Sequence, residues 1–264
     1  MIPEGADSYS TDPHRKRSIF SRIFLRPKCT FYFQTFWIIW KNSRKALKGI
    51  YPAEKWAESS FEILRALENI GTSITITGMD NLRTFDGPAV FIANHMSTLE
   101  TFVLPCIIQP IKPVTFVVKQ SLIDTPVFGP IMRSRDPILV GRTNPREDLR
   151  AVLEGGTKKL QAGQSIVIFP QSTRSFIFTP EEFNTLGIKL ALKANVPAVP
   201  IALKTDAWGI GKLVKDFGSI DTRKKVNFAF GEPMTIQNRG AEEHQKVITF
   251  ISEKLGQWQR EENT

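Results

Sequence analysis

His95 and Glu100 combine residue types and a spacing that could perform acid–base chemistry. His95 follows Asn94 at the end of an apolar run at 90–93, and Glu100 comes five residues later. A carboxylate bonded to one imidazole nitrogen fixes the tautomer and leaves the other nitrogen free to accept a proton from an alcohol. The two side chains cannot share one helical face, because five residues advance about 140° beyond a full turn. The pair therefore predicts His95 in the turn before a helix and Glu100 in the first turn of that helix.

The same stretch fits a structural alternative. Ser97 and Glu100 have the spacing of a capping box, in which the glutamate bonds to the first backbone amide of its own helix. His95 would then be only a structural hydrogen-bonding residue. The spacing alone leaves the catalytic and the capping interpretations open.

A second cluster of polar side chains lies at 171–175, with the sequence Gln-Ser-Thr-Arg-Ser. It follows another apolar run, at 165–168, and gathers hydroxyl groups and a guanidinium in a short loop. Arg174 suits a phosphate, because its planar guanidinium can bond two oxygens and stays charged. The alternative is that Arg174 pairs with a surface carboxylate, which is the commoner fate of a single arginine.

Apolar runs alternate with amphipathic segments from residue 54 onward. Asn144 and Thr179, each followed by Pro and then by Glu at the third helical position, predict two helix starts. The alternation predicts an α/β fold, a single domain with a largely parallel β-sheet covered by helices. The expected strands are 73–77, 89–93, 114–118, 137–140, 165–169, 198–203 and 226–230, and the expected helices are 54–70, 98–108, 145–162, 180–194 and 241–258.

The positive charge of the chain is concentrated near its N-terminus. The net charge is +9, and residues 13–53 contain ten Lys and Arg but no Asp or Glu. The uncharged, aromatic-rich run at 29–40 is shorter than the roughly 20 apolar residues that cross a bilayer as a helix. Such a segment is typical of an interfacial helix, whose rings enter the headgroup boundary while Lys and Arg pair with lipid phosphates. The alternative is a helix that packs its aromatic rings on the protein's own core.

Three parts of the chain are therefore predicted: a disordered tail at 1–12, an amphipathic membrane-binding segment at 13–53 and a folded domain at 54–264. Anionic membrane lipid is the expected partner, and nucleic acid is not, because no nucleic-acid-binding motif accompanies the charge. Cys29 and Cys106 give neither a disulfide framework nor a zinc spacing, which favours a reducing cytoplasm. No metal is expected.

Together the two loops resemble the glycerolipid acyltransferases, specifically the bacterial 1-acylglycerol-3-phosphate acyltransferases. That family carries an N-H-x-x-x-x-D motif after a strand and, later, F-P-E-G-T-R-S, with K-x-x-L…P…G…R between them and V-P-x-x-P after them. The matching residues are Asn94, His95 and Glu100; Phe169, Pro170, Thr173, Arg174 and Ser175; Lys119, Leu122, Pro126, Gly129 and Arg142; and Val196, Pro197 and Pro200.

The resemblance implies a membrane-associated enzyme that moves a fatty acyl group from acyl-CoA or acyl carrier protein to the free hydroxyl of 1-acylglycerol 3-phosphate, giving phosphatidic acid. His95 would be the general base, oriented by Glu100, and Lys119 or a nearby amide would stabilise the thioester oxyanion. Arg174 and Arg142 would hold the acceptor's phosphate. No cofactor is implied, and the expected location is the cytoplasmic face of the inner membrane, as a peripheral or monotopic protein. The remaining expected substrate contacts are Asn94, Gln171, Ser172 and Thr173.

Three positions depart from the family pattern. Glu100 replaces Asp, Gln171 replaces Glu and Ser172 replaces Gly. The last two keep open another acceptor, such as a lyso-aminolipid, another lysophospholipid or glycerol 3-phosphate. A non-catalytic, membrane-bound lipid-binding protein, with Glu100 as helix cap, is the alternative from a different class.

Overall fold

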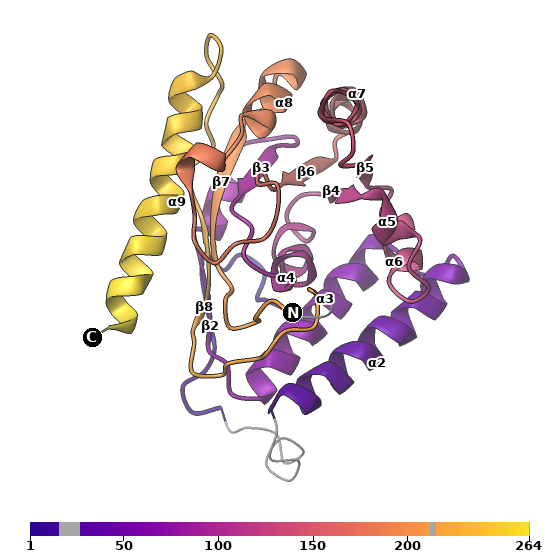
Figure 1. Cartoon of the computed structure of the whole chain (residues 1–264). Helices are drawn as coiled ribbons and strands as arrows, with labels where there is room; N and C mark the ends of the chain where they lie inside the picture. The colour runs from indigo at the N-terminus through magenta and orange to yellow at the C-terminus, as the bar shows by residue number, and fades with distance from the viewer. Residues whose placement is uncertain (16–26, 212–214, 264) are drawn as a thin grey trace.

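The computed structural model describes residues 1–15, 27–211 and 215–263, and these residues form one eight-stranded sheet with helices on both faces (Figure 1). The strand order across the sheet is β1-β2-β8-β7-β3-β6-β4-β5. The strands are β1 (Tyr9–Ser10), β2 (Ile74–Thr77), β3 (Val90–Ala93), β4 (Val114–Lys119), β5 (Ile138–Val140), β6 (Ser165–Ile168), β7 (Ala198–Lys204) and β8 (Val226–Phe230).

Most neighbouring strands run parallel, as predicted. β3 is central and pairs in parallel with β6 on one side and β7 on the other, so that Phe91 lies opposite both Val167 and Val199. Only the pairs β7–β8 and β1–β2 are antiparallel among the described strands. All seven strands expected from the sequence are present, with bounds within one residue of the expected ones. Buried strands of a parallel sheet are apolar throughout, which makes their sequences easy to recognise.

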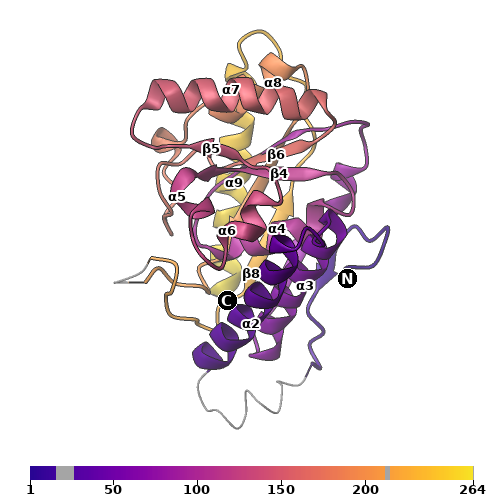
Figure 2. The same ribbon diagram turned by 90° about the vertical axis from the view of Figure 1, so that its right-hand side faces the viewer.

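The helices lie in two layers, with a hydrophobic core on each face of the sheet. Figure 2 shows α7 and α8 on one side of the strands and α2, α3 and α4 on the other. In β3, Phe91 and Ala93 belong to the core beneath α3 and α4, whereas Val90 and Ile92 belong to the core beneath α8. The helices are α2 (Pro27–Leu47), α3 (Ala53–Asn69), α4 (Leu99–Ile108), α5 (Gln120–Ile123), α6 (Gly129–Arg133), α7 (Pro145–Gln161), α8 (Leu186–Ala194) and α9 (Ala241–Glu262), with 3-10 turns η1 (Met79–Leu82) and η2 (Pro180–Glu182).

The continuous helix predicted over 180–194 is wrong. The segment divides into η2 and α8, and the Thr179 side chain makes no capping bond. Asn184 provides the reason: its Oδ1 accepts from the Leu186 amide at 2.9 Å, while its Nδ2 donates to the Pro170 carbonyl at 2.7 Å. The helix therefore begins where the chain is tied to the loop after β6. At the other predicted start, the Asn144 side chain does accept from the Arg146 amide, at 3.1 Å.

The prediction of a disordered tail at 1–12 is also wrong. Tyr9 and Ser10 form β1, an edge strand paired with β2. Glu68 accounts for this order, because its carboxylate is buried and needs hydrogen-bond donors. The hydroxyls of Tyr9 and Thr11 each donate to Glu68 at 2.7 Å, and the Arg65 guanidinium lies 2.8 Å away. Tyr9 and Thr11 are 59 and 57 residues from Glu68 in sequence, so no local pattern reveals these two partners.

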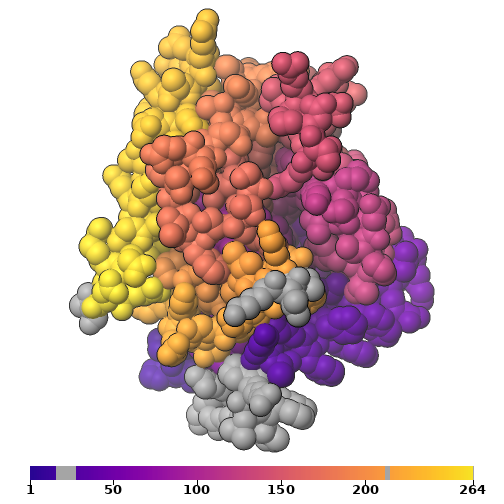
Figure 3. Space-filling view, viewed as in Figure 1, coloured from indigo at the N-terminus to yellow at the C-terminus, as the bar shows by residue number. Residues whose placement is uncertain are grey.

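Helix α2 supplies most of the predicted basic segment, and residues 16–26 of that segment lie outside the described residues. Only part of this helix follows the usual pattern of a surface helix, in which apolar side chains face the core. Phe33, Phe36 and Trp37 are exposed, at 73%, 57% and 55%, whereas Thr30 and Thr35 are buried with no hydrogen-bond partner for either hydroxyl among the described residues. The space-filling view shows α2 as open surface at the lower right (Figure 3).

The expected alternative, in which α2 packs its aromatic rings on the core, therefore applies to only part of the helix. Phe31 is buried and lies edge-on to Trp208, with ring centroids 5.0 Å apart. Across the described residues, every helix is too short or too polar to span a membrane.

Candidate active site

The two polar clusters predicted from the sequence meet at one edge of the sheet. Each follows a strand, and β3 and β6 are parallel neighbours, so their carboxyl ends lie side by side. Two hydrogen bonds join the loops: the His95 amide donates to Gln171 Oε1 at 2.6 Å, and the Ser175 amide donates to the His95 carbonyl at 2.9 Å. The topology thus brings together residues that are about 80 positions apart in sequence.

His95 and Glu100 form the expected pair, with His95 Nδ1 2.5 Å from Glu100 Oε2. Glu100 is buried, and its Oε1 accepts from the amides of Met96 and Ser97 at 2.8 Å and from the Thr205 hydroxyl at 2.5 Å. Glu100 therefore caps the start of the helix through Oε1 and holds the His95 imidazole through Oε2. The imidazole remains 16% exposed, and its Nε2 has no hydrogen-bond partner in the described part of the chain.

Phe169 fixes the plane of the imidazole. Its ring stacks on His95 with centroids 4.3 Å apart and an angle of 19° between the planes. Phe169 is also close to Phe116, with ring centroids 6.5 Å apart. With Nδ1 bonded to Glu100 and one face covered by Phe169, the ring presents Nε2 in a fixed direction.

Two of the expected substrate contacts instead hold the loops in place. Asn94 is buried, and its side-chain amide pairs with both backbone groups of Leu203 in β7, at 2.8 Å each. Gln171 is also buried and accepts from the His95 amide. The structure therefore places these side chains behind the site, where they position His95. Thr205 was not predicted as a site residue, although it is a polar residue that follows a buried strand.

Arg174 lies beside the start of α4 and forms an ion pair with a half-exposed carboxylate, as in the structural alternative to phosphate binding. Its Nη1 is 2.7 Å from Asp216 Oδ1 and also donates to the Thr98 hydroxyl. Thr98 in turn donates to the same carboxylate oxygen at 3.1 Å. The guanidinium has five N–H donors, and only Nη1 has a partner among the described residues, so the group can still bind an anion.

Arg142 reaches the same loop from the end of β5. Its backbone is left-handed, with φ 57°, and the Asp148 carboxylate holds this turn by accepting from the amides of Gly141 and Arg142 at 2.8 and 2.9 Å. The Arg142 guanidinium donates to the Ser172 carbonyl. A second positive charge is thereby brought to the 171–175 loop.

The family of the chain follows from comparison with known proteins. The profile of the Acyltransferase family matches residues 73–204, which is half of the 264-residue chain and contains both loops. The chain belongs to this family. This acyltransferase is similar to the 1-acyl-sn-glycerol-3-phosphate acyltransferase of Pseudomonas aeruginosa, with 26% identity over 212 residues, covering 78% of the chain and 77% of that protein.

A relative of the same kind from Chlamydomonas reinhardtii is 32% identical over 130 residues, which cover 49% of the acyltransferase but only 38% of that protein. The crystal structure of the 1-acyl-sn-glycerophosphate acyltransferase PlsC from Thermotoga maritima aligns with a TM-score of 0.66 at 19% identity, covering 90% of this chain and 98% of that one. The structural match establishes the shared fold.

Three more predicted residues of the acyltransferase are exposed at this edge of the sheet. Lys119 ends β4, which is separated from β3 by β6, so its backbone is about 10 Å from that of β3. Its ammonium group has no hydrogen bond or ion pair within the described residues. Thr173 and Ser172 are exposed in the loop after β6. The structure does not bring Lys119 into contact with His95 or Glu100.

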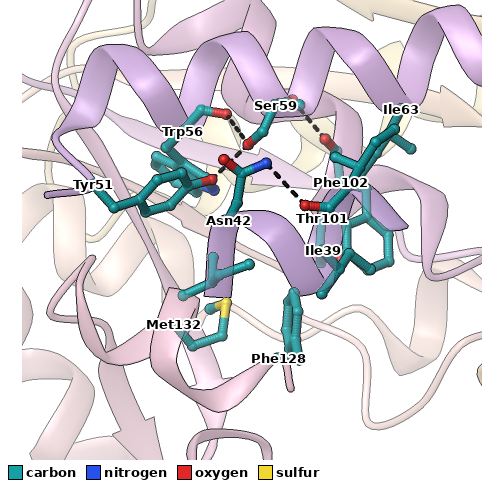
Figure 4. A pocket seen from close by; sticks show the side chains of 13 residues that line it. Ile39, Asn42, Tyr51, Trp56, Ser59, Ile63, Thr101, Phe102, Phe128 and Met132 are labelled. Atoms are coloured by element: carbon teal, nitrogen blue, oxygen red, sulfur yellow. Dashed lines mark hydrogen bonds between the residues drawn. The ribbon is translucent and has the colours of Figure 1, made fainter. Parts of the chain in front are cut away.

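A pocket of the acyltransferase lies between α2, α3, α4 and α6, and Figure 4 shows its lining. Most of the side chains around it are apolar, among them Ile39, Phe102 and Phe128. The polar side chains in its wall are bonded within the protein: Asn42 donates to the Ile38 carbonyl at 2.9 Å, and the hydroxyls of Tyr51 and Ser59 share a bond of 2.5 Å. The pocket therefore offers an apolar surface.

Proposed function

We propose that this acyltransferase transfers a fatty acyl group from a thioester to the free hydroxyl of 1-acylglycerol 3-phosphate, giving phosphatidic acid. The His95–Glu100 pair carries the proposal, because His95 Nε2 is open next to the 171–175 loop. This loop contains Arg174 and binds the Arg142 guanidinium through the Ser172 carbonyl. The names of the relatives support the same acceptor.

In the proposed mechanism, His95 Nε2 takes the proton of the acceptor hydroxyl as its oxygen attacks the thioester carbonyl. The imidazolium that forms is stabilised by the buried Glu100 carboxylate at Nδ1. The tetrahedral intermediate then expels the thiolate, which receives the proton. General-base catalysis of this kind contributes a factor of about 10²–10⁴ in rate.

The attack is direct, and no acyl-enzyme forms. The sequence has no G-x-S-x-G nucleophile elbow. Ser97 is buried, and its hydroxyl donates to Thr205 and accepts from the Leu99 amide, as a structural side chain does. The reaction needs no cofactor, because the thioester of CoA or of acyl carrier protein supplies the activated acyl group.

Positive charge beside the base binds the acceptor in this proposal. Arg174 and Arg142 hold the phosphate, since guanidinium groups form charge-assisted bonds to phosphate oxygens. Lys119 or a backbone amide stabilises the oxyanion of the thioester. The exposure of Lys119 and its place at the same edge of the sheet are compatible with a side chain that meets substrate only in the ternary complex.

The aromatic face of α2 is proposed to enter the headgroup region of a membrane. The exposed Phe33, Phe36 and Trp37 resemble the apolar side of an interfacial helix, and Lys41 and Arg44 lie about one and two turns further on. The pocket beside this helix is chemically suited to an acyl chain. The protein would then be peripheral or monotopic, on the cytoplasmic face of the inner membrane, where the acceptor lipid is available.

Acyl transfer from oleoyl-CoA to lysophosphatidate in mixed micelles tests the proposal. The His95→Gln variant is expected to lose about 10²–10⁴ in kcat. His244→Gln, a substitution on α9, is the matched control and should retain activity. A His95→Gln variant as active as wild type would contradict the mechanism. A panel with lysophosphatidylethanolamine and glycerol 3-phosphate tests the acceptor, and absence of turnover with every acceptor would favour a lipid-binding protein.

A further inference from the structure

The ion pair between Arg174 and Asp216 lies where the proposed function needs a free positive charge. Arg174 is 17% exposed and Asp216 is 45% exposed, so the carboxylate is at the mouth of the site and the guanidinium lies deeper. One carboxylate oxygen, Asp216 Oδ1, contacts both the Arg174 guanidinium and the Thr98 hydroxyl. An incoming phosphate would find an anion already bound to the arginine.

The backbone around Asp216 is anchored by several contacts, whereas the carboxylate is held only through Oδ1 among the described residues. The Trp208 indole donates to the Asp216 carbonyl at 3.1 Å, and the Tyr32 hydroxyl donates to the Gly218 carbonyl at 2.9 Å. Burial, and to a smaller extent the Asp216 charge, raises the pKa of Tyr32 to about 12, so this hydroxyl remains a donor. The backbone at Gly218 also packs closely against Gly209, because a Cβ at Gly218 would lie 1.7 Å from the Gly209 carbonyl oxygen.

Because the backbone is anchored, departure of the carboxylate from Arg174 is a rotation of the Asp216 side chain. No movement of the backbone is required, and the half-exposed carboxylate can be solvated by water when it leaves. Because the carboxylate is half-exposed, water screens the contact and reduces the free energy of the ion pair toward the small values of surface pairs. A phosphate with two negative charges and three terminal oxygens is the stronger ligand for a guanidinium.

We propose that Asp216 is an intramolecular competitor for the phosphate of the acceptor. Its carboxylate occupies Arg174 in the free enzyme and is displaced when the phosphorylated lipid binds. This role rests on the proposed function, because it assigns the anion that Arg174 binds. The product carries the same phosphate as the acceptor, so Asp216 weakens the binding of both lipids. It thereby favours release of the product. Asp216 thus acts through Arg174 and is a positioning residue rather than a catalytic one.

The Asp216→Asn variant tests this role, because it removes the charge and preserves the shape of the side chain. Its KM for lysophosphatidate should fall by up to about fivefold, the range for an exposed ion pair, and its inhibition by phosphatidate should tighten to the same extent. The kcat should not rise. Asp221→Asn is the matched control, since Asp221 lies on the same loop and pairs with Arg223 outside the site.

Equilibrium binding separates a failure of this inference from a failure of the proposed function. In a His95→Gln background, the affinity for 1-hexanoylglycerol 3-phosphate should increase with Asp216→Asn, while that for the uncharged 1-hexanoylglycerol should not change. In a further Arg174→Gln background, the effect of Asp216→Asn should vanish. A weaker or unchanged affinity for the phosphorylated probe would overturn the competitor role even if turnover is normal. Tighter binding without turnover in wild type would uphold it and reject the reaction instead.

Discussion

At the scale of single residues, the Glu100 side chain both stabilises the loop and contacts the proposed general base, His95. One carboxylate oxygen closes the start of α4 and accepts from Thr205, and the other faces His95 Nδ1. A carboxylate can only accept hydrogen bonds, so Nδ1 must carry the proton and Nε2 must be the basic nitrogen. The family's shorter Asp is replaced here by a side chain with one more methylene, which nevertheless reaches the imidazole.

The Glu100→Gln substitution is therefore expected to reduce kcat by about 10²–10⁴ with little change in KM. The amide oxygen can keep the backbone bonds of α4, which leaves the amide NH₂ to face His95. That group donates to Nδ1 and forces the proton onto Nε2, which can then no longer act as a base. Initial rates with oleoyl-CoA and lysophosphatidate measure the effect. Glu100→Asp is the control that retains a carboxylate, and it should be more active than Glu100→Gln. The reverse order would leave Glu100 as a helix cap alone.

At the scale of elements, the strands were predictable because burial on both faces makes them apolar runs. The same reasoning placed His95 and Arg174 in loops that follow strands, and the structure shows that these strands, β3 and β6, are parallel neighbours. The reasoning failed where a side chain distant in sequence decides the outcome: Glu68 orders β1, and Asn184 ends the segment before α8. The partners that complete the site are Thr205 and Asp216. Thr205 has the same local signal as His95, since it follows a buried strand, whereas Asp216 is brought to the site by the topology alone.

Helix α4 offers a test of such a distant contact. Pro105 interrupts its backbone bonding, and Ser60 of α3 enters the gap: its hydroxyl donates to the Phe102 carbonyl at 2.5 Å and accepts from the Cys106 amide at 2.9 Å. Ser60→Ala should lower the free energy of unfolding by about 1–3 kcal/mol, because these buried groups lose their partner. Urea denaturation measures the change. Ser121→Ala, at an exposed position in α5, should stay within about 0.5 kcal/mol of wild type. Equal stability of both variants would mean that α4 closes the gap itself.

At the scale of the whole molecule, the acyltransferase is asymmetric. Exposed aromatic rings gather on α2, at one end of the molecule, whereas α8 lies at the other end in both ribbon views (Figures 1 and 2). The net charge of +9 adds an attraction to anionic lipid that does not depend on this face. Binding to vesicles should therefore contain a salt-sensitive part and a salt-resistant part, and the resistant part should depend on α2.

The Trp37→Ser variant tests that separation. Removing one exposed indole from the aromatic face of α2 should weaken binding to phosphatidylglycerol-containing vesicles by about tenfold or more at high salt, since burial of a large apolar side chain contributes about 1.5–3 kcal/mol. Vesicle sedimentation at two salt concentrations provides the measurement. Leu192→Ser removes an exposed apolar side chain from α8 and should leave binding unchanged. If Trp37→Ser instead alters the oligomeric state by light scattering and leaves vesicle binding intact, the aromatic face of α2 covers a second copy of the chain and not a membrane.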